Sequence, residues 1–250
     1  MSRVDLFNGV EFTIEGTNTK YHSYDDWGLY VTNTDCIKEP KQNTNYVVIP
    51  GRDGVLDLSD VTSGRPTYSG REIKIVLSGH RNKVNWDSVL SAFRNSINGK
   101  TCKIIFDNDK EYYWRGRVVI KDFESAMSLG SFTVDIPNAD PYKYDVLQSS
   151  EPWLWDPFSF VTGVIVYTGA TVITGSGSIT IPHGNMPTCP NIVVSKKLSG
   201  TFKLSYGGQT YNLVLGDNKI PSILVGGDKD VVLNFTGSAT VQVVYRSGSL

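Results

Sequence analysis

The chain has 250 residues, and its 24 basic and 25 acidic side chains give a formal net charge of −1. This balance argues against a protein that holds nucleic acid by its phosphates, because such binding needs a surplus of lysine and arginine. Three widely spaced cysteines without a CxxC pair fit neither a zinc ribbon nor a disulfide framework. The chain also lacks an apolar stretch long enough to span a bilayer and an N-terminal apolar segment of the secretory kind, so we expect no membrane insertion and no signal peptide.

Alternation of apolar and polar residues predicts β-strands in both halves of the chain. Such alternation places one face of a strand on a core and the other face in water. Turn signals such as Asp107–Asp109 and Gly207–Gly208 separate the runs, and short strands at this spacing are typical of β-sandwiches and barrels. The clearest alternating runs, in chain order, are Ile73–Leu77, Phe132–Ile136, Ile179–Ile181 and Val241–Tyr245.

One stretch, NWDSVLSAFRNSING, has the spacing of an amphipathic helix instead, and it predicts a helix over about residues 85–98. Asn85 is a suitable N-cap, and Gly99 follows where the helix is expected to stop. The apolar residues on the predicted buried face are Trp86, Val89, Leu90, Phe93 and Ile97.

The composition changes partway along the chain, which indicates two domains. Charged residues are dense before about Leu147, whereas the second half is rich in glycine, serine, threonine and valine. The segment from Asp135 to Pro157 holds four prolines and little periodicity, as a linker does. We therefore predict a mainly β protein, with an N-terminal β-sandwich and one packed α-helix over residues 1–147 and a smaller all-β sandwich over residues 148–250.

The stretch IPGRDGVLDLSD, residues 49–60, could hold a phosphate, bind calcium, pair carboxylates or form a turn. A phosphate loop needs a lysine and a hydroxyl residue after its last glycine, and the carboxylates here have the wrong spacing for a calcium loop. Asp57 stands between two leucines, so on a strand it points away from the apolar face. A turn that leads into a strand is the better account, because Gly51 and Gly54 permit positive φ.

Other stretches give no stronger case for catalysis or metal binding. DNDKEYYW, residues 107–114, combines carboxylates with an asparagine, but it fits a hairpin turn better than a metal loop. The histidines form neither HxH nor HExxH, and the sequence contains no GxSxG nucleophile elbow. We therefore predict a protein that is not an enzyme, with no catalytic residue, no metal and no cofactor.

Two pairs of side chains leave alternatives open. Trp153 and Trp155 in EPWLWDP could stack on sugar rings, or they could pack a domain junction as apolar anchors. Arg115 and Arg117 alternate on a predicted strand, so both face one side. There they could pair with acidic residues of a neighbouring subunit or remain in solvent.

Taken together, several stretches resemble the distal tail proteins of long-tailed, non-contractile bacteriophages. The resemblance rests on the order and spacing of the stretches and covers nearly the whole chain, more loosely in the C-terminal half. In the first half these are FNG (7–9), DWGLYV (26–31), IPGRDGVLDLSD, GREIKI (70–75) and the helix that leads into NGKTCKIIFDNDKEYYWRGRV. In the second half they are GNMPTCPNIVV (184–194), GDNKIPSI (216–223) and the closing VQVVYRSGSL.

The resemblance implies a structural virion protein without chemistry. Such proteins form a hexameric ring at the distal end of the tail, which is the hub of the baseplate or tail-tip adsorption apparatus. The ring joins the tail-tube protein above to a tail-associated fibre or lysin protein below, and DNA passes through its lumen without specific binding. The protein is then expected to be made in the cytoplasm of the bacterial host.

The resemblance also implies that residues 49–71 form an extended arm or hairpin at the interface between ring subunits. The main alternative is a carbohydrate-binding β-sandwich protein that recognises a host cell-wall glycan through Trp153 and Trp155. A tail-tube subunit and a glycosidase are further alternatives. The residues that we predict at the subunit interface are Gly51, Arg52, Asp53, Gly54, Asp57, Tyr68, Arg71, Arg115 and Arg117.

Overall fold

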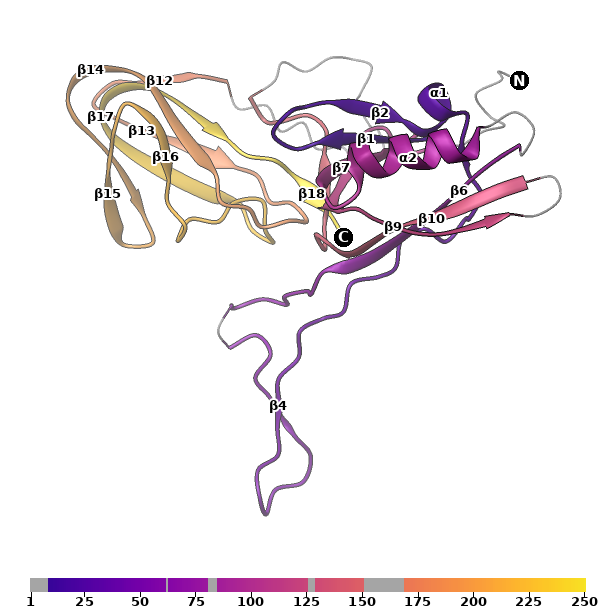
Figure 1. The fold of residues 1–250 in the computed structure, drawn as a ribbon. Helices are drawn as coiled ribbons and strands as arrows, with labels where there is room; N and C mark the ends of the chain where they lie inside the picture. The colour runs from indigo at the N-terminus through magenta and orange to yellow at the C-terminus, as the bar shows by residue number, and fades with distance from the viewer. Residues whose placement is uncertain (1–8, 62, 81–84, 126–128, 151–168) are drawn as a thin grey trace. The chain divides into compact units, whose positions relative to one another are not determined.

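The computed structural model describes residues 9–61, 63–80, 85–125, 129–150 and 169–250. The chain divides into two compact units, Met1–Pro141 (unit 1) and Tyr142–Leu250 (unit 2). Both units consist mainly of β-strands, and the described helices lie in unit 1 (Figure 1). This result confirms the predicted fold class. The units divide at Pro141 and Tyr142, whereas the sequence suggests a change of domain at residues 147 and 148.

The described residues of unit 1 form two antiparallel sheets and a separate short pair of strands. The first sheet has the strand order β8-β7-β1-β2, the second has the order β3-β6-β10-β9, and β4 pairs with β5. The strands are β1 (Val10–Ile14), β2 (Lys20–His22), β3 (Tyr30–Val31), β4 (Tyr46–Val47), β5 (Leu56–Asp57), β6 (Arg71–His80), β7 (Thr101–Phe106), β8 (Tyr112–Arg117), β9 (Val119–Ser125) and β10 (Leu129–Ala139).

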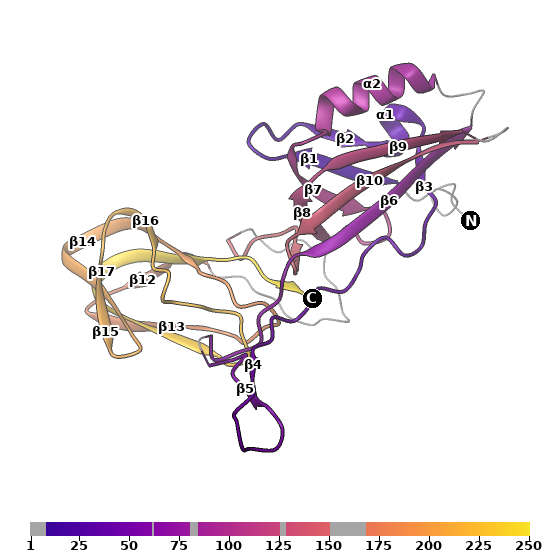
Figure 2. The ribbon, with the colours of Figure 1, turned by 60° about the horizontal axis from the view of Figure 1, so that its bottom comes forward.

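The helix predicted from the spacing of its apolar residues is confirmed as α2 (Trp86–Ile97), which lies alongside the sheets (Figure 2). Asn85 caps the helix by accepting a hydrogen bond from the Ser88 amide. Phe93 is fully buried, and its ring centroid lies 5.7 Å from that of Phe12 on β1 and 5.0 Å from that of Phe132 on β10. The helix and both sheets therefore share one hydrophobic core.

The short helix α1 (Ser23–Trp27) is not predicted by the sequence pattern. The Nδ1 atom of His22 accepts a hydrogen bond from the Asp25 amide at 3.2 Å, which caps its first turn. Gly28, with φ of +67°, ends the helix in the left-handed conformation that favours glycine. A helix of five residues is too short to show a repeating apolar face, so only its caps could indicate it.

The prediction of a linker from Asp135 to Pro157 is wrong for part of this segment. Residues 135–139 belong to β10, and Lys143–Asp145 form β11. Pro137 fits inside β10 because the register with β6 shifts between Ile136 and Ala139, and a proline is tolerated where a strand is irregular.

Unit 2 is a β-sandwich built on two long strands, β14 and β17, which pair with each other along most of their length. One end of this pair binds β12 and β16, and the other end binds β13 and β15. In its core the rings of Phe202 and Phe235 stack with their centroids 5.6 Å apart. The strands of unit 2 are β11 (Lys143–Asp145), β12 (Thr171–Ile173), β13 (Ser176–Ile181), β14 (Asn191–Tyr206), β15 (Gln209–Leu213), β16 (Gly216–Lys219), β17 (Val231–Val244) and β18 (Gly248–Ser249).

The two ends of unit 2 pair with each other. Lys143 lies opposite Ser249 in the antiparallel pair of β11 and β18, and the Asp145 amide donates a hydrogen bond to the Ser247 carbonyl at 3.0 Å. Gly248 lies so close to the Lys143 carbonyl that a Cβ atom has no room there. The first strand of unit 2 is therefore held directly against the last strand of the chain.

Candidate functional site

The most distinctive feature of unit 1 is a long excursion between β3 and β6, which we call the arm (residues 40–61 and 63–69; Figure 1). Its outgoing and returning legs run antiparallel. The Asn43 amide donates to the Thr67 carbonyl at 2.8 Å, and the Leu58 amide donates to the Asn45 carbonyl at 2.8 Å. Tyr68, one of the predicted interface residues, forms a β-bridge with Gln42 near the base of the arm.

The distal part of the arm is exposed to solvent in unit 1. Residues 41–55 are all exposed. Among them, Tyr46 is 56% exposed, Val48 is 71% exposed and Val55 is 53% exposed. An isolated two-stranded hairpin is at best marginally stable in water, and clustered exposed apolar side chains mark interaction surfaces. The arm is therefore the best candidate for a contact with another protein molecule.

The tip of the arm is shaped by the two glycines that the sequence singles out. Gly51 has φ of +80° and Gly54 has φ of +81°, which confirms the expected left-handed backbone at both positions. The Arg52 amide donates to the Ile49 carbonyl at 3.2 Å and closes a turn. Arg52 and Asp53 are exposed at this tip, so their charged groups are accessible to a neighbouring molecule.

Asp57 is exposed on β5, and its carboxylate has a local partner. Its Oδ1 atom accepts hydrogen bonds from the Ser59 amide at 2.9 Å and from the Ser59 hydroxyl at 2.5 Å. These bonds lower the pKa of Asp57, because they favour the ionised carboxylate. Asp57 therefore shapes the returning leg of the arm.

Arg71 is not available for the predicted subunit contact. The side chain is buried, with 3% exposure, and its Nε atom donates to the Pro141 carbonyl at 2.8 Å. Its guanidinium lies over the ring of Trp114, 4.3 Å from the centroid. Burial lowers the pKa of Arg71. The expectation that Arg71 contacts another subunit is wrong, because its side chain is an internal part of unit 1.

Replacement of Arg71 by methionine is expected to lower the free energy of unfolding by roughly 1–3 kcal/mol, because the part-buried Pro141 carbonyl loses its donor. Denaturant unfolding followed by circular dichroism measures this loss. The matched control is Arg52→Met at the exposed arm tip, which is expected to leave the unfolding free energy unchanged. Equal effects of the two substitutions would contradict the internal role of Arg71.

Arg115 and Arg117 also find partners within their own unit. The Nε and Nη2 atoms of Arg115 donate to the two carboxylate oxygens of Glu15 at 2.6 and 3.0 Å, and Asp140 lies 3.4 Å from Nη1. The hydrogen bond to Glu15 raises the pKa of Arg115. Arg117 donates to the Gly99 carbonyl. The same chain thus supplies acidic partners to Arg115, whereas the sequence left open partners on a neighbouring subunit or a position in solvent.

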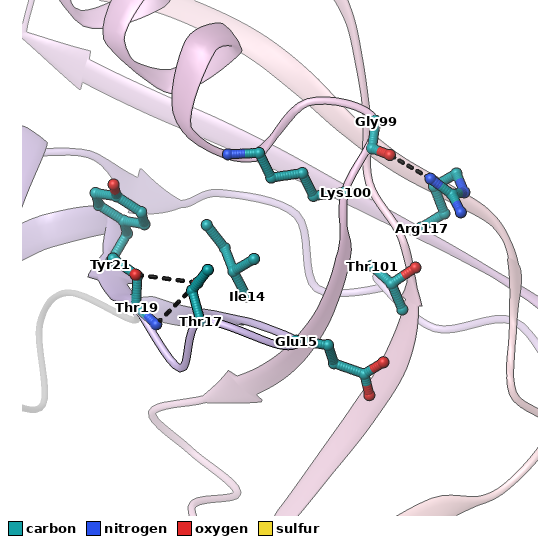
Figure 3. Close-up of a pocket in the computed structure, with 9 residues that line it drawn as sticks. All are labelled: Ile14, Glu15, Thr17, Thr19, Tyr21, Gly99, Lys100, Thr101 and Arg117. Carbon is teal, nitrogen blue, oxygen red and sulfur yellow. Dashed lines mark hydrogen bonds between the residues drawn. The ribbon is translucent and has the colours of Figure 1, made fainter.

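An open pocket of about 600 Å³ lies beside these arginines (Figure 3). Its only lining carboxylate belongs to Glu15, which is already held by Arg115, so the lining offers no facing carboxylate pair. It also contains no serine, cysteine or histidine that could form a nucleophile–base pair. The lining residues are Ile14, Glu15, Thr17, Thr19, Tyr21, Gly99, Lys100, Thr101 and Arg117.

The connection between β7 and β8 is the predicted hairpin turn, and the carboxylate of Asp107 in this turn holds neighbouring backbone in place. Asp107 accepts a hydrogen bond from the Gly9 amide at 2.8 Å and lies 3.3 Å from both His22 and Lys110. Burial alone favours a higher pKa for Asp107, but the Gly9 bond and the charge of His22 outweigh it and lower the pKa.

Across the part of the chain that the structure describes, no three histidine, cysteine or acidic side chains gather as a metal site requires. The described helices are too short or too polar to cross a membrane.

Trp153 and Trp155, the residues considered for glycan stacking, lie outside the described residues. Glycan binding through these side chains therefore stays a prediction.

Comparison with known proteins gives a similarity of fold but no similarity of sequence that identifies a family. No protein-family model and no curated protein matches the sequence. The fold is similar to that of a hub protein from the adsorption apparatus of phages that infect Gram-positive bacteria. That protein is SPP1 Dit (gp 19.1), and the match covers 96% of this chain and 98% of the SPP1 chain, with a TM-score of 0.56 and 12% sequence identity. The similarity therefore spans nearly the full length of both chains.

Proposed function

We propose that this chain is a structural protein of a phage tail, which assembles into a homohexameric ring at the distal end of the tail. As the hub of the tail tip, the ring joins the tail-tube protein to a fibre or lysin protein and lets DNA pass through its lumen. The observation that carries this proposal is the full-length fold similarity to SPP1 Dit, which extends over both units. The protein then acts by assembly, without catalysis or a cofactor.

The arm provides the means of assembly. A ring needs a heterologous contact, in which one patch of a subunit meets a different patch on the next subunit. The arm carries exposed apolar side chains and an exposed strand pair that a neighbour can cover. Arg52 and Asp53 at its tip are placed to fix the register of the contact. The near-neutral net charge of the chain suits a conduit, because a strongly basic lumen would hold the DNA phosphates.

The purified wild-type protein is expected to form rings with sixfold symmetry. Light scattering is expected to give a mass near six times the 27.6 kDa of the chain, and negative-stain electron microscopy is expected to show uniform particles with a central hole. A protein that stays monomeric at every concentration tested contradicts self-assembly. Binding of purified cell-wall glycan by such a monomer would favour the carbohydrate-binding alternative instead.

A further inference from the structure

The open pocket of unit 1 (Figure 3) keeps two cations available to a ligand. Lys100 and Arg117 line it, and both side chains are exposed. Among the described residues, Lys100 pairs with no acidic side chain, and Arg117 donates to the Gly99 carbonyl, which is a neutral group. Glu15, the only lining carboxylate, has both of its oxygens held by Arg115. The lining therefore carries positive charge that no lining carboxylate neutralises.

The backbone fixes where these two cations lie. Gly99, with φ of +74°, turns the chain from the end of α2 into β7. Its amide donates to the Val118 carbonyl at 2.8 Å, and the Val118 amide donates to the Lys100 carbonyl at 3.0 Å. Thr101 lies opposite Arg117 in the pair of β7 and β8, and opposed residues of an antiparallel pair share a face. The start of β7 and the end of β8 therefore hold both cations and the Thr101 hydroxyl at one site.

The opposite wall of the pocket comes from the hairpin of β1 and β2 and adds hydroxyl donors. The Thr17 hydroxyl oxygen accepts hydrogen bonds from the Thr19 amide at 3.4 Å and from the Thr19 hydroxyl at 3.1 Å, so its own hydrogen is left to donate. The ring of Tyr21 stacks on that of Trp27, with centroids 5.4 Å apart, which fixes the position of this wall. In Figure 3 the Lys100 side chain extends toward Tyr21.

The lining side chains favour a ligand that accepts hydrogen bonds and carries negative charge. Lysine and arginine side chains only donate, and an ionised carboxylate only accepts. A carboxylate placed between Lys100 and Arg117 would form charge-assisted hydrogen bonds, which are stronger than neutral ones.

The size and the position of the pocket favour a peptide segment over a free ion. The volume of about 600 Å³ is much larger than one ion needs and lies within the range of about 300–1,000 Å³ that is usual for sites of larger ligands. Among the described strands, β2, which carries Tyr21, is the outermost strand of its sheet. An outermost strand has unpaired backbone groups, to which an extended peptide can add.

We infer that this pocket binds an acidic segment of a partner protein, with carboxylates of the segment at Lys100 and Arg117. The site is separate from the arm, and the inference does not depend on ring formation.

Isothermal titration of the full chain with a blocked tetraglutamate peptide tests this site, with blocked tetraglutamine as the neutral probe. The titration is made at low ionic strength, because salt screens exposed charges. Tetraglutamate is expected to bind, and the double variant Lys100→Gln/Arg117→Gln is expected to weaken its binding by at least about tenfold, because both charge-assisted contacts are lost. The control Lys203→Gln/Lys219→Gln removes the same charge from exposed positions of unit 2 and is expected to leave the affinity unchanged. The single variant Lys100→Gln is expected to show part of the loss while keeping the bond from Arg117 to Gly99.

Three results would overturn the inference. If tetraglutamate does not bind, or binds no more tightly than tetraglutamine, the pocket does not select carboxylates. If the pocket variant and the unit 2 control lose affinity equally, the peptide binds through overall charge and not at this pocket. If inorganic phosphate binds as tightly as tetraglutamate, the site takes a free anion rather than a protein segment. Circular dichroism of each variant is expected to match that of the wild type, since the substituted side chains are exposed.

Discussion

A protein in which Gly51 and Gly54 are both replaced by valine is expected to stay folded but fail to form rings. Both positions have positive φ, where a β-branched residue is strongly disfavoured, and the strain amounts to about 1–2 kcal/mol per residue. A Cβ atom at either position meets no other atom within 4 Å, so the substitutions act on the backbone of the tip alone. Light scattering measures the loss of rings, and circular dichroism verifies the fold.

A matched control separates the arm tip from glycine turns in general. Gly207 and Gly208 connect β14 and β15 in unit 2, have φ of +56° and +78°, and likewise have no atom near their Cβ positions. The double variant Gly207→Val/Gly208→Val introduces comparable strain at a turn that the proposed interface does not include. It is expected to form complete rings. Complete rings from the Gly51/Gly54 variant as well would count against the arm as the assembly element.

Replacement of Phe93 by alanine is expected to lower the free energy of unfolding of unit 1 by about 3–5 kcal/mol, because it removes a large buried ring and leaves a cavity. Phe93 is fully buried and contacts three other aromatic rings, those of Phe12, Phe132 and Trp27, at centroid distances of 5.7, 5.0 and 4.5 Å. Hydrogen exchange followed by mass spectrometry, peptide by peptide, reports which unit loses protection. We expect the loss in unit 1.

The corresponding substitution in the other core is the control. Phe235 is 1% exposed in unit 2, where it stacks on Phe202. Since the two hydrophobic cores share no residue, Phe235→Ala is expected to reduce protection in unit 2 and leave unit 1 unchanged. Equal loss of protection in both units from either substitution would show that the two cores unfold together.

The elements that the sequence predicts well are those with a local signal. The apolar spacing from Trp86 to Ile97 and the cap at Asn85 define α2, since an amphipathic helix repeats its contacts within a few turns. Alternation predicts β6 and β10 in the same way. The positive φ of Gly51 and Gly54 follows from residue type alone, because few other residues tolerate that conformation.

The features that the sequence does not predict depend on distant partners. Arg71 is read as a surface residue because arginine is rarely buried, and its burial requires Trp114 and Pro141, which lie far along the chain. Pro137 suggests the end of a strand, but an irregular register with β6 accommodates it. In the candidate site, the presence of the arm is predicted from the family resemblance, and the positive φ of its glycines is predicted from residue type. The pairing of Arg115 with Glu15 requires β1 and β8 to be placed in one sheet, which no local pattern specifies.

The antiparallel pair of β11 and β18 determines where a tag fused after Leu250 would lie on unit 2. Because Lys143 faces Ser249, a tag or reporter fused after Leu250 emerges beside the strand where unit 2 begins, and Leu250 itself is 44% exposed. A fusion at the exposed Gly207–Gly208 hairpin would instead leave the sandwich from a loop between β14 and β15. Labels attached at these two positions would therefore mark different points of unit 2 in electron micrographs and give its orientation in an assembled particle.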